Sequence, residues 1–452
     1  KSYGGAGGGG YSGGGSNGRH APGGGGGSYL IGSAVNVKTS NGFFQGSSSF
    51  NGGQITNLNS YNNSHGKAII TQLKGNITIV ATNGNAENSG WIYSNGFIIA
   101  TQDVNIESSV IESYLAQGNL TLDGINIILN DELNYTSNNL TFNASGDVIL
   151  NNNVTANENL SISAYGDIRS PLDGNIQIST QGGILSLKSD SDESDGGGIL
   201  LSDANLTTNG GDIILGGGLN GTGYAEGSAD GPLGQRYKGI WLHRTTLDAS
   251  GTSSGGNISI KGKGWQGADW STPDAGDYAI GVDITTDVVI STNYEGVITV
   301  DGVGGKNSKS DTHGAGINFF NGPEISTEAG AISISGEAGS GLARVHAGIR
   351  LDGGNTPSIF STSGNIELIG KGDPSTDTGI DFGASFNLGW NGLNTPTSGT
   401  ITLSSDSFSF AATSNLRTSG ELVIRPTNSS FANNLSYPIP NQFPLVKYHL
   451  LV

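Results

Sequence analysis

A four-residue pattern recurs three times at a spacing of 20 residues: Asn119-Leu120-Thr121-Leu122, Asn139-Leu140-Thr141-Phe142 and Asn159-Leu160-Ser161-Ile162. Apolar and polar residues alternate in each copy, which is typical of a β-strand with one buried face. A second apolar segment follows each copy at nearly the same offset, at Ile127–Leu129, Val148–Leu150 and Ile168. Each unit therefore contains at least two short strands separated by Gly or Asn turns.

A unit of this length cannot enclose a core of its own. Successive units can bury their apolar faces by stacking, because equivalent residues then lie about 4.8 Å apart in a continuous interior column. This arrangement is a parallel β-helix, or β-solenoid. The sequence predicts an all-β fold of this kind, with rungs of about 20 residues over residues 30–210.

The repeat becomes longer over residues 211–426. Strands that open with glycine recur at spacings of 45, 40, 34, 34 and 35 residues, at Gly211, Gly256, Gly296, Gly330, Gly364 and Gly399. A second glycine series interleaves with the first, at Gly239, Gly281, Gly316, Gly348 and Gly379. We interpret each repeat of 34–45 residues as two rungs of the same solenoid, with insertions at one edge.

Both ends of the chain differ from the repeat. Residues 1–29 form a Gly-rich N-terminal extension, whose composition is typical of a linker. Residues 427–452 contain several prolines, which interior ladder strands exclude, and we expect a C-terminal cap or arm. If subunits join end to end, the candidate joining residues lie in these two segments: Gly7, Tyr11, Phe443, Tyr448 and Leu450.

Composition excludes several classes of protein. The 452 residues include 77 Gly, no Cys and no Met, and only 34% are hydrophobic. Helix-rich folds, disulfides and thiolate metal sites are therefore excluded, and the missing Met predicts a processed part of a longer product. The net charge of −18 argues against nucleic acid as a partner, and no apolar run could span a membrane. We expect a secreted, extracellular protein of the bacterial cell surface.

The units Gly-Asn-Ile-x-Ile and Gly-Ile-x-Leu, with Ser or Thr before the glycine as in Ser363-Gly364-Asn365-Ile366, suggest a family. They resemble the β-helix repeats of filamentous-haemagglutinin-type large exoproteins, the adhesins of two-partner secretion. Residues 416–426 resemble a unit that ends such arrays, and the likeness covers roughly residues 70–426. It implies a right-handed β-helix that is exported through an outer-membrane transporter. The Asn-Pro motifs of that family's secretion domain are absent from this sequence.

Acidic residues cluster in one turn, at Asp190, Asp192 and Asp195. The opening Asp-x-Asp resembles a calcium loop, but Ser194 and Leu201 stand at positions five and twelve, where the pattern of such a loop differs. A solvated turn is the leading interpretation, and a weak cation site is the alternative. The six His residues lack ligand spacing, and we expect no metal site, no cofactor and no catalytic residue.

Three tryptophans lie close together in the sequence, at Trp241, Trp265 and Trp270. Packing or an interface is the leading interpretation, and contact with a glycan is the alternative, because aromatic faces stack on sugar rings. Many Asn-x-Ser/Thr triplets also open strands at a repeated position. We expect these Asn side chains to form stacked turns that satisfy backbone groups.

The sequence predicts a non-enzymatic extracellular protein, a stiff surface rod that mediates adhesion or contacts in a matrix or biofilm. Its expected partners are neighbouring domains or other copies of the chain, and glycans or host-cell surfaces. One alternative is a subunit that assembles end to end into an extracellular filament, since open sheet ends can template the next subunit. The other is a β-helical enzyme that degrades polysaccharides.

Overall fold

The computed structural model describes residues 37–39, 53–57, 68–72, 74–82, 84, 89–193, 196–218, 223–229, 235, 237–266, 278–307, 314–341, 346–372, 378–390, 395–410, 415–428 and 447–450. The chain divides into two compact units, Lys1–Gly75 with Ala100–Asp103, and Asn76–Ile99 with Val104–Val452. In the smaller unit, three strands form one sheet: β1 (Val37–Thr39) runs parallel to β2 (Gly53–Asn57), and β2 is antiparallel to β3 (Ala68–Gln72).

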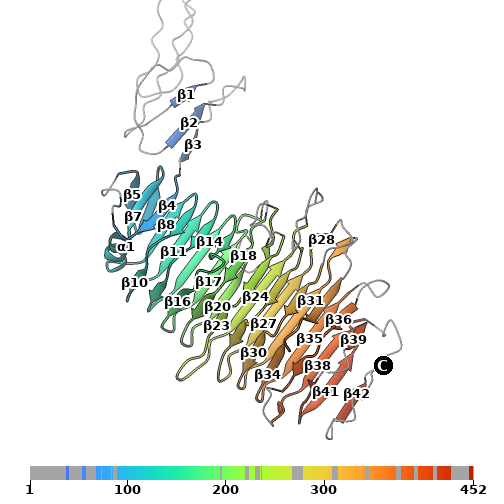
Figure 1. The fold of residues 1–452 in the computed structure, drawn as a ribbon. Helices are drawn as coiled ribbons and strands as arrows, with labels where there is room; N and C mark the ends of the chain where they lie inside the picture. The colour runs from blue at the N-terminus through green and yellow to red at the C-terminus, as the bar shows by residue number, and fades with distance from the viewer. Residues whose placement is uncertain are drawn as a thin grey trace, which may run out of the picture. The chain divides into compact units, whose positions relative to one another are not determined.

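The larger unit is a parallel β-helix whose strands stack rung upon rung in three long sheets, named here sheets A, B and C (Figure 1). The first strand of each rung belongs to sheet A. Its order from the N-terminal end is β5 (Trp91–Ser94), β6 (Phe97–Ala100), β8 (Leu120–Gly124), β11 (Leu140–Ala144), β14 (Leu160–Ala164), β17 (Leu185–Ser189), β20 (Ile213–Gly217), β24 (Ile258–Lys263), β27 (Ile298–Val303), β31 (Ile332–Glu337), β35 (Ile366–Lys371), β38 (Ile401–Ser405), β41 (Glu421–Arg425) and β42 (Lys447–Leu450).

The second strand of each rung belongs to sheet B. Its order is β7 (Val104–Glu107), β4 (Ile77–Val80), β9 (Ile127–Leu129), β12 (Val148–Leu150), β15 (Ile168–Arg169), β18 (Ile199–Ser202), β22 (Ile240–His243), β25 (Val282–Thr285), β29 (Ile317–Phe320), β33 (Ala347–Asp352), β36 (Thr378–Phe382) and β39 (Phe408–Phe410). Strand β4 lies between β7 and β9, out of chain order.

The third strand of each rung belongs to sheet C. Its order is β10 (Leu133–Tyr135), β13 (Val154–Ala156), β16 (Ile176–Thr180), β19 (Ala204–Thr207), β23 (Thr246–Asp248), β26 (Val289–Ser291), β30 (Glu324–Thr327), β34 (Ser358–Ser361), β37 (Asn387–Leu388) and β40 (Asn415–Leu416). Three short strands lie outside this stack. Strand β21 (Ala225–Glu226) pairs with β24, and β28 (Lys306–Asn307) pairs with β32 (Ser340–Gly341).

The register confirms the 20-residue units. Leu120, Leu140 and Leu160 are direct neighbours in sheet A, and their side chains are buried. In the longer repeats, Ile213 pairs directly with Ile258 and Ile258 with Ile298, and the pattern continues to β38. The interpretation of each long repeat as two rungs is therefore wrong. Each is one three-stranded rung. Most of the additional length lies between the sheet A strand and the sheet B strand, except in the rung of β35, where the longest connection is between β37 and β38.

Asn and Asp side chains stack between rungs, as expected. At the start of the sheet A strands, the Asn139 amide donates to Asn119 Oδ1 at 2.9 Å, and the Val297 amide donates to Asn257 Oδ1 at 3.0 Å. The corresponding corner of sheet B uses the same contact, since the Asp147 amide donates to Asn126 Oδ1 at 2.7 Å. These side chains satisfy backbone donors that lie outside the strands.

The N-terminal end of the solenoid departs from the prediction. We expected rungs from residue 30, but the first strand of the long sheets in the chain is β4, and residues 30–75 belong to the smaller unit. Strands β5 and β6 are joined by Asn95 at φ 50° and Gly96 at φ 82°. Two positive φ angles in succession are typical of the tight type I′ hairpin turn. The helix α1 (Ser108–Leu115) packs against β10, the first strand of sheet C.

At the other end, β42 pairs in parallel with β41 and so extends sheet A. Tyr448 and Leu450, two of the candidate joining residues, lie in this strand and pair within their own chain. Gly7, Tyr11 and Phe443 lie outside the described residues. In the described part of the chain, no helix is both long and apolar enough to cross a membrane.

Candidate functional site

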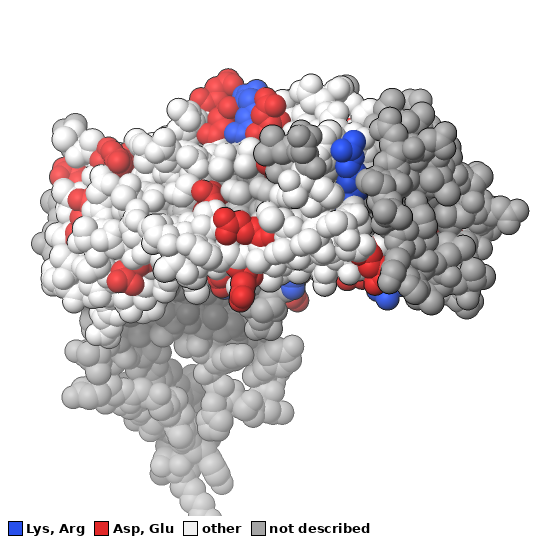
Figure 2. Space-filling view, turned by 90° about the horizontal axis from the view of Figure 1, so that it is seen from below, with Lys and Arg blue, Asp and Glu red and all other residues white. Residues whose placement is uncertain are grey.

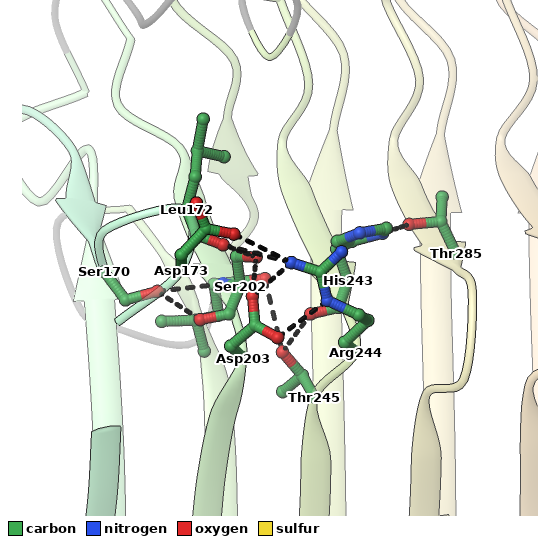
Figure 3. A network of polar contacts seen from close by, with 10 residues as sticks. Ser170, Leu172, Asp173, Ser202, Asp203, His243, Arg244, Thr245 and Thr285 are labelled. Carbon is green, nitrogen blue, oxygen red and sulfur yellow. Dashed lines mark hydrogen bonds and ion pairs between the residues drawn. The ribbon is translucent and has the colours of Figure 1, made fainter. Parts of the chain in front are cut away.

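A hollow of about 380 Å³ opens on the outer side of sheet B, beside the corner at which its strands turn towards sheet C. It spans successive rungs, because its walls come from the turn after β15, the end of β18 and the end of β22. The residues that line it are Leu172, Asp173, Ser202, Gln235, Trp241, His243 and Arg244. Figure 3 shows most of these side chains and their polar contacts.

Strand alternation decides which side chains of β22 reach the hollow. Ile240 and Leu242 are fully buried in the core, so Trp241 and His243 face outwards. Ser202 of β18 lies beside His243 in register. Arg244 follows His243 and has a φ of 45°. This left-handed backbone conformation directs the Arg244 side chain along the wall of the hollow towards the preceding rungs.

Arg244 is held by two carboxylates of the preceding rungs. Its Nε donates to Asp203 Oδ1 at 2.7 Å and its Nη2 donates to Asp203 Oδ2 at 2.6 Å. The two parallel bonds form a bidentate pair, the strongest arrangement for arginine and a carboxylate. Nη2 also lies 3.3 Å from both Asp173 Oδ1 and the Leu172 carbonyl oxygen. The hydrogen bond from Arg244 lowers the pKa of Asp203, so this carboxylate is ionised at neutral pH.

His243 is neutral and its tautomer is fixed by its neighbours. Its Nδ1 lies 3.0 Å from Thr285 Oγ1, and the Thr285 hydroxyl donates to the Leu242 carbonyl. The hydroxyl proton is thus already used, so Nδ1 carries the proton and Nε2 is an acceptor. Burial first and the Arg244 charge second lower the pKa of His243, which favours the neutral ring.

The floor of the hollow is tightly packed. The rings of Trp241 and His243 are nearly parallel, with centroids 5.3 Å apart. Lys238 Nζ lies 5.5 Å from the centroid of Trp241 and forms a 3.0 Å ion pair with Asp283, in which both side chains are buried. Trp241 is only 9% exposed. Packing is therefore its main role, and the hollow reaches only its edge.

The structure describes two of the three tryptophans, and they have different neighbours. Trp265 packs against Tyr237 and Ala279, and its amide donates to the Tyr237 carbonyl at 2.9 Å. Trp270 lies outside the described residues. Of the two described tryptophans that the sequence predicted as contact residues, Trp241 lines the hollow and Trp265 does not.

The acidic turn lies apart from the hollow. Asp190 is 5% exposed, and its Oδ1 has no hydrogen-bond partner. Burial, followed by the charges of Glu226 and Asp192, raises the pKa of Asp190 to about 7. Asp195 lies outside the described residues, and within them no three His, Asp or Glu side chains are grouped to hold a metal ion.

Sequence reasoning missed Asp173, Asp203, His243 and Arg244. Arg244 and Asp203 are 41 residues apart, and Arg244 and Asp173 are 71 residues apart. No local motif joins them, and only the rung register brings them together.

No protein-family model, curated protein or solved structure matches the chain. The chemistry of the hollow therefore rests on its own residues. It offers a carboxylate acceptor, guanidinium and imidazole groups, and an apolar side chain, Leu172, that is 54% exposed. This combination of a few fixed polar groups beside apolar surface is typical of small-ligand sites.

Proposed function

We propose that this protein is a non-enzymatic, extracellular β-helical surface protein of the adhesin type, and that the hollow beside Arg244 binds carbohydrate. The observation that carries the proposal is the preformed hollow, whose polar groups are fixed by partners on adjacent rungs. The resemblance of the repeats to filamentous-haemagglutinin-type exoproteins supports a place at the bacterial cell surface.

Rigidity favours binding at this position. The Arg244 side chain is fixed by a bidentate pair and His243 by Thr285, so these groups lose little conformational freedom when a ligand arrives. Ser202 and His243 end regular strands, and Asp203 and Arg244 directly follow them, so these side chains hold their positions better than those on long loops. A stacked solenoid can also carry such a site on a stiff body, which suits a protein that works by contact.

The polar contacts give less support for turnover. A nucleophilic serine needs a base within hydrogen-bond reach. Ser202 Oγ instead donates to the Leu172 carbonyl at 2.7 Å and lies 2.8 Å from Asp203 Oδ2. Asp203 is paired with Arg244 and its pKa is lowered, so its carboxylate is a weak base for Ser202 and is unsuitable as a general acid.

A glycan array tests this function with the full 452-residue chain. We expect binding to a subset of glycans, a loss of signal in Arg244→Gln, and no released sugar on prolonged incubation. Arg425→Gln is the matched control, because Arg425 also pairs with a carboxylate, Glu367 at 2.9 Å, at the C-terminal end of sheet A. Product release would favour the polysaccharide-degrading enzyme, and an empty array would contradict carbohydrate binding.

End-to-end assembly is a second candidate. Among the described residues, sheets A, B and C end at β42, β39 and β40, each of which is paired on one side only. Such edges can accept further strands. At the opposite end α1 packs on β10, so a continued ladder would have to displace this helix. Negative-stain microscopy distinguishes rods of one length from continuous filaments.

A further inference from the structure

We propose that the hollow selects a neutral sugar, through two neighbouring hydroxyls that bond to Asp173 and Arg244, and that it rejects sugars bearing a carboxylate. This inference rests on the proposed carbohydrate binding and adds the class of ligand. It follows from how Arg244 is used, from the charge around the hollow and from the groups that remain open to a ligand.

Arg244 cannot offer the two-pronged contact by which arginine usually holds a carboxylate. That contact needs two parallel N–H groups on one side of the guanidinium. The Nε and Nη2 side already binds both oxygens of Asp203, and Nη2 also contacts Asp173 Oδ1 and the Leu172 carbonyl. Among the described residues, the bonds of Arg244 leave only the N–H groups of Nη1 open, and both two-pronged edges of the guanidinium include Nη2, which is already used. Nη1 alone can donate to a hydroxyl but cannot form the two-pronged contact with a carboxylate.

The charge around the hollow is negative. Asp173 and Asp203 together carry two negative charges against one positive charge on Arg244, and Asp287 acts electrostatically on both Arg244 and His243. His243 contributes no compensating charge, because its ring is neutral. Lys238 is neutralised by Asp283 at 3.0 Å. An anionic sugar would therefore meet net repulsion, whereas a neutral one would not.

Asp173 provides the matching acceptor. Its side chain is 94% exposed, and only Oδ1 contacts Arg244, so Oδ2 faces outwards as an acceptor. A carboxylate beside a guanidinium N–H presents an acceptor next to a donor, which suits two adjacent hydroxyls because each hydroxyl can both donate and accept. The exposed side chain of Leu172 lies next to this pair and can contact the C–H face of a sugar ring.

The volume of the hollow limits the ligand. Its volume is about 380 Å³. Small-molecule sites extend to roughly 1000 Å³, so the hollow lies near the lower end of their range. One or two sugar rings fit this volume. On the face seen in Figure 2, acidic residues form several separate groups, only some with basic residues beside them, between wide areas without Asp, Glu, Lys or Arg.

The experiment compares matched sugars in calorimetric titrations of the full chain. The probes are methyl glycosides of glucose, galactose and mannose, and the uronic acid of each. We expect at least one neutral glycoside to bind and its uronic acid to bind at least tenfold more weakly. In Asp173→Asn the neutral glycoside should bind about tenfold more weakly. The difference in affinity between the neutral glycoside and its uronic acid should become smaller, because one negative charge is removed.

Asp123→Asn is the control for charge alone, since Asp123 lies in sheet A and accepts from Asn143 Nδ2 at 3.0 Å. It should leave both affinities unchanged. Equal or tighter binding of the uronic acid would overturn this inference while leaving carbohydrate binding intact. Unchanged affinities in Asp173→Asn would also overturn it. If no probe and no array glycan binds, the proposed function fails as well.

Discussion

Gly330 follows Gly296 in the stack so closely that a Cβ atom on Gly330 would overlap the carbonyl oxygen of Gly296. The same overlap would occur between Gly364 and Gly330, and between Gly399 and Gly364. The corner is closed further by Thr327, whose hydroxyl donates to the Gly296 carbonyl at 3.0 Å. The repeated glycine at this corner is therefore a steric requirement of the stacking.

Gly330→Ala should destabilise the solenoid. The added methyl group meets backbone rather than a movable side chain, so the rungs must separate locally. We expect a loss of about 1–3 kcal/mol in the free energy of unfolding, the usual cost of overpacking. Urea denaturation followed by circular dichroism measures this loss.

Gly118→Ala is the matched control. A Cβ atom at Gly118 would have no neighbour within 4 Å, and its φ is not in the left-handed region. Its unfolding midpoint should equal or exceed that of the wild type. Equal midpoints for Gly330→Ala and the wild type would contradict the steric role of the glycine column.

Breaking the buried ion pair of Lys238 and Asp283 should lower the free energy of unfolding more than breaking an exposed ion pair. Lys238→Met leaves the Asp283 carboxylate buried, with the Asn318 Nδ2 donor at 2.8 Å as a remaining partner. We expect a loss of about 3–5 kcal/mol. Lys371→Met is the control, because the pair of Lys371 and Glu337 is exposed at 3.9 Å. An exposed pair should change stability by less than about 1 kcal/mol. Similar losses of stability in Lys238→Met and Lys371→Met would contradict the burial of the Lys238–Asp283 pair.

Asp190 should make stability depend on pH. Its pKa is about 7 in the folded chain, against 3.8 for an ordinary aspartate. Between these values the folded chain keeps a proton that the unfolded chain loses, so stability falls as pH rises from about 4 to about 7 and then levels off. Asp190→Asn should flatten this slope and be more stable than the wild type at pH 8. If the stability of Asp190→Asn and of the wild type fell equally with pH, Asp190 would not be the cause of the pH dependence.

The side-chain stack at the start of sheet A should contribute about one hydrogen bond per rung. Asn365 Oδ1 accepts from the Thr400 amide at 2.9 Å. Asn365→Ala removes this acceptor, and we expect a loss of about 0.5–1.5 kcal/mol. Asn365→Asp keeps an acceptor oxygen and should recover most of the loss.

Asn134→Ala, at an exposed position of β10, is the control for this stack. Its melting temperature should stay close to that of the wild type. A thermal melt in which Asn134→Ala unfolds at a lower temperature than Asn365→Ala would argue against the stack.

The sequence predicts the fold well where every rung has a strong apolar pattern. Leu120, Leu140 and Leu160 occupy the predicted register because alternation and a constant spacing leave no alternative that buries them. The interpretation of the long repeats as two rungs failed for a physical reason. The strands of sheet C are short, and Thr246–Asp248 has one buried residue, Leu247, which is too little to mark a strand.

The site could not be predicted in the same way. Packing or an interface was the leading interpretation of Trp241, and the structure covers its ring with Lys238 and His243. The sequence did not identify these two neighbours. Asp173, Asp203 and Arg244 converge because three rungs stack, and the unequal rung lengths conceal that convergence in the sequence.

A crystal structure of the chain with the tightest-binding neutral glycan tests the central claim most directly. We predict one sugar ring in the hollow, with adjacent hydroxyls on Asp173 and on Nη1 of Arg244, and no movement of the bidentate pair of Arg244 and Asp203. A glycan bound elsewhere on the solenoid, with the hollow filled only by water, would contradict it.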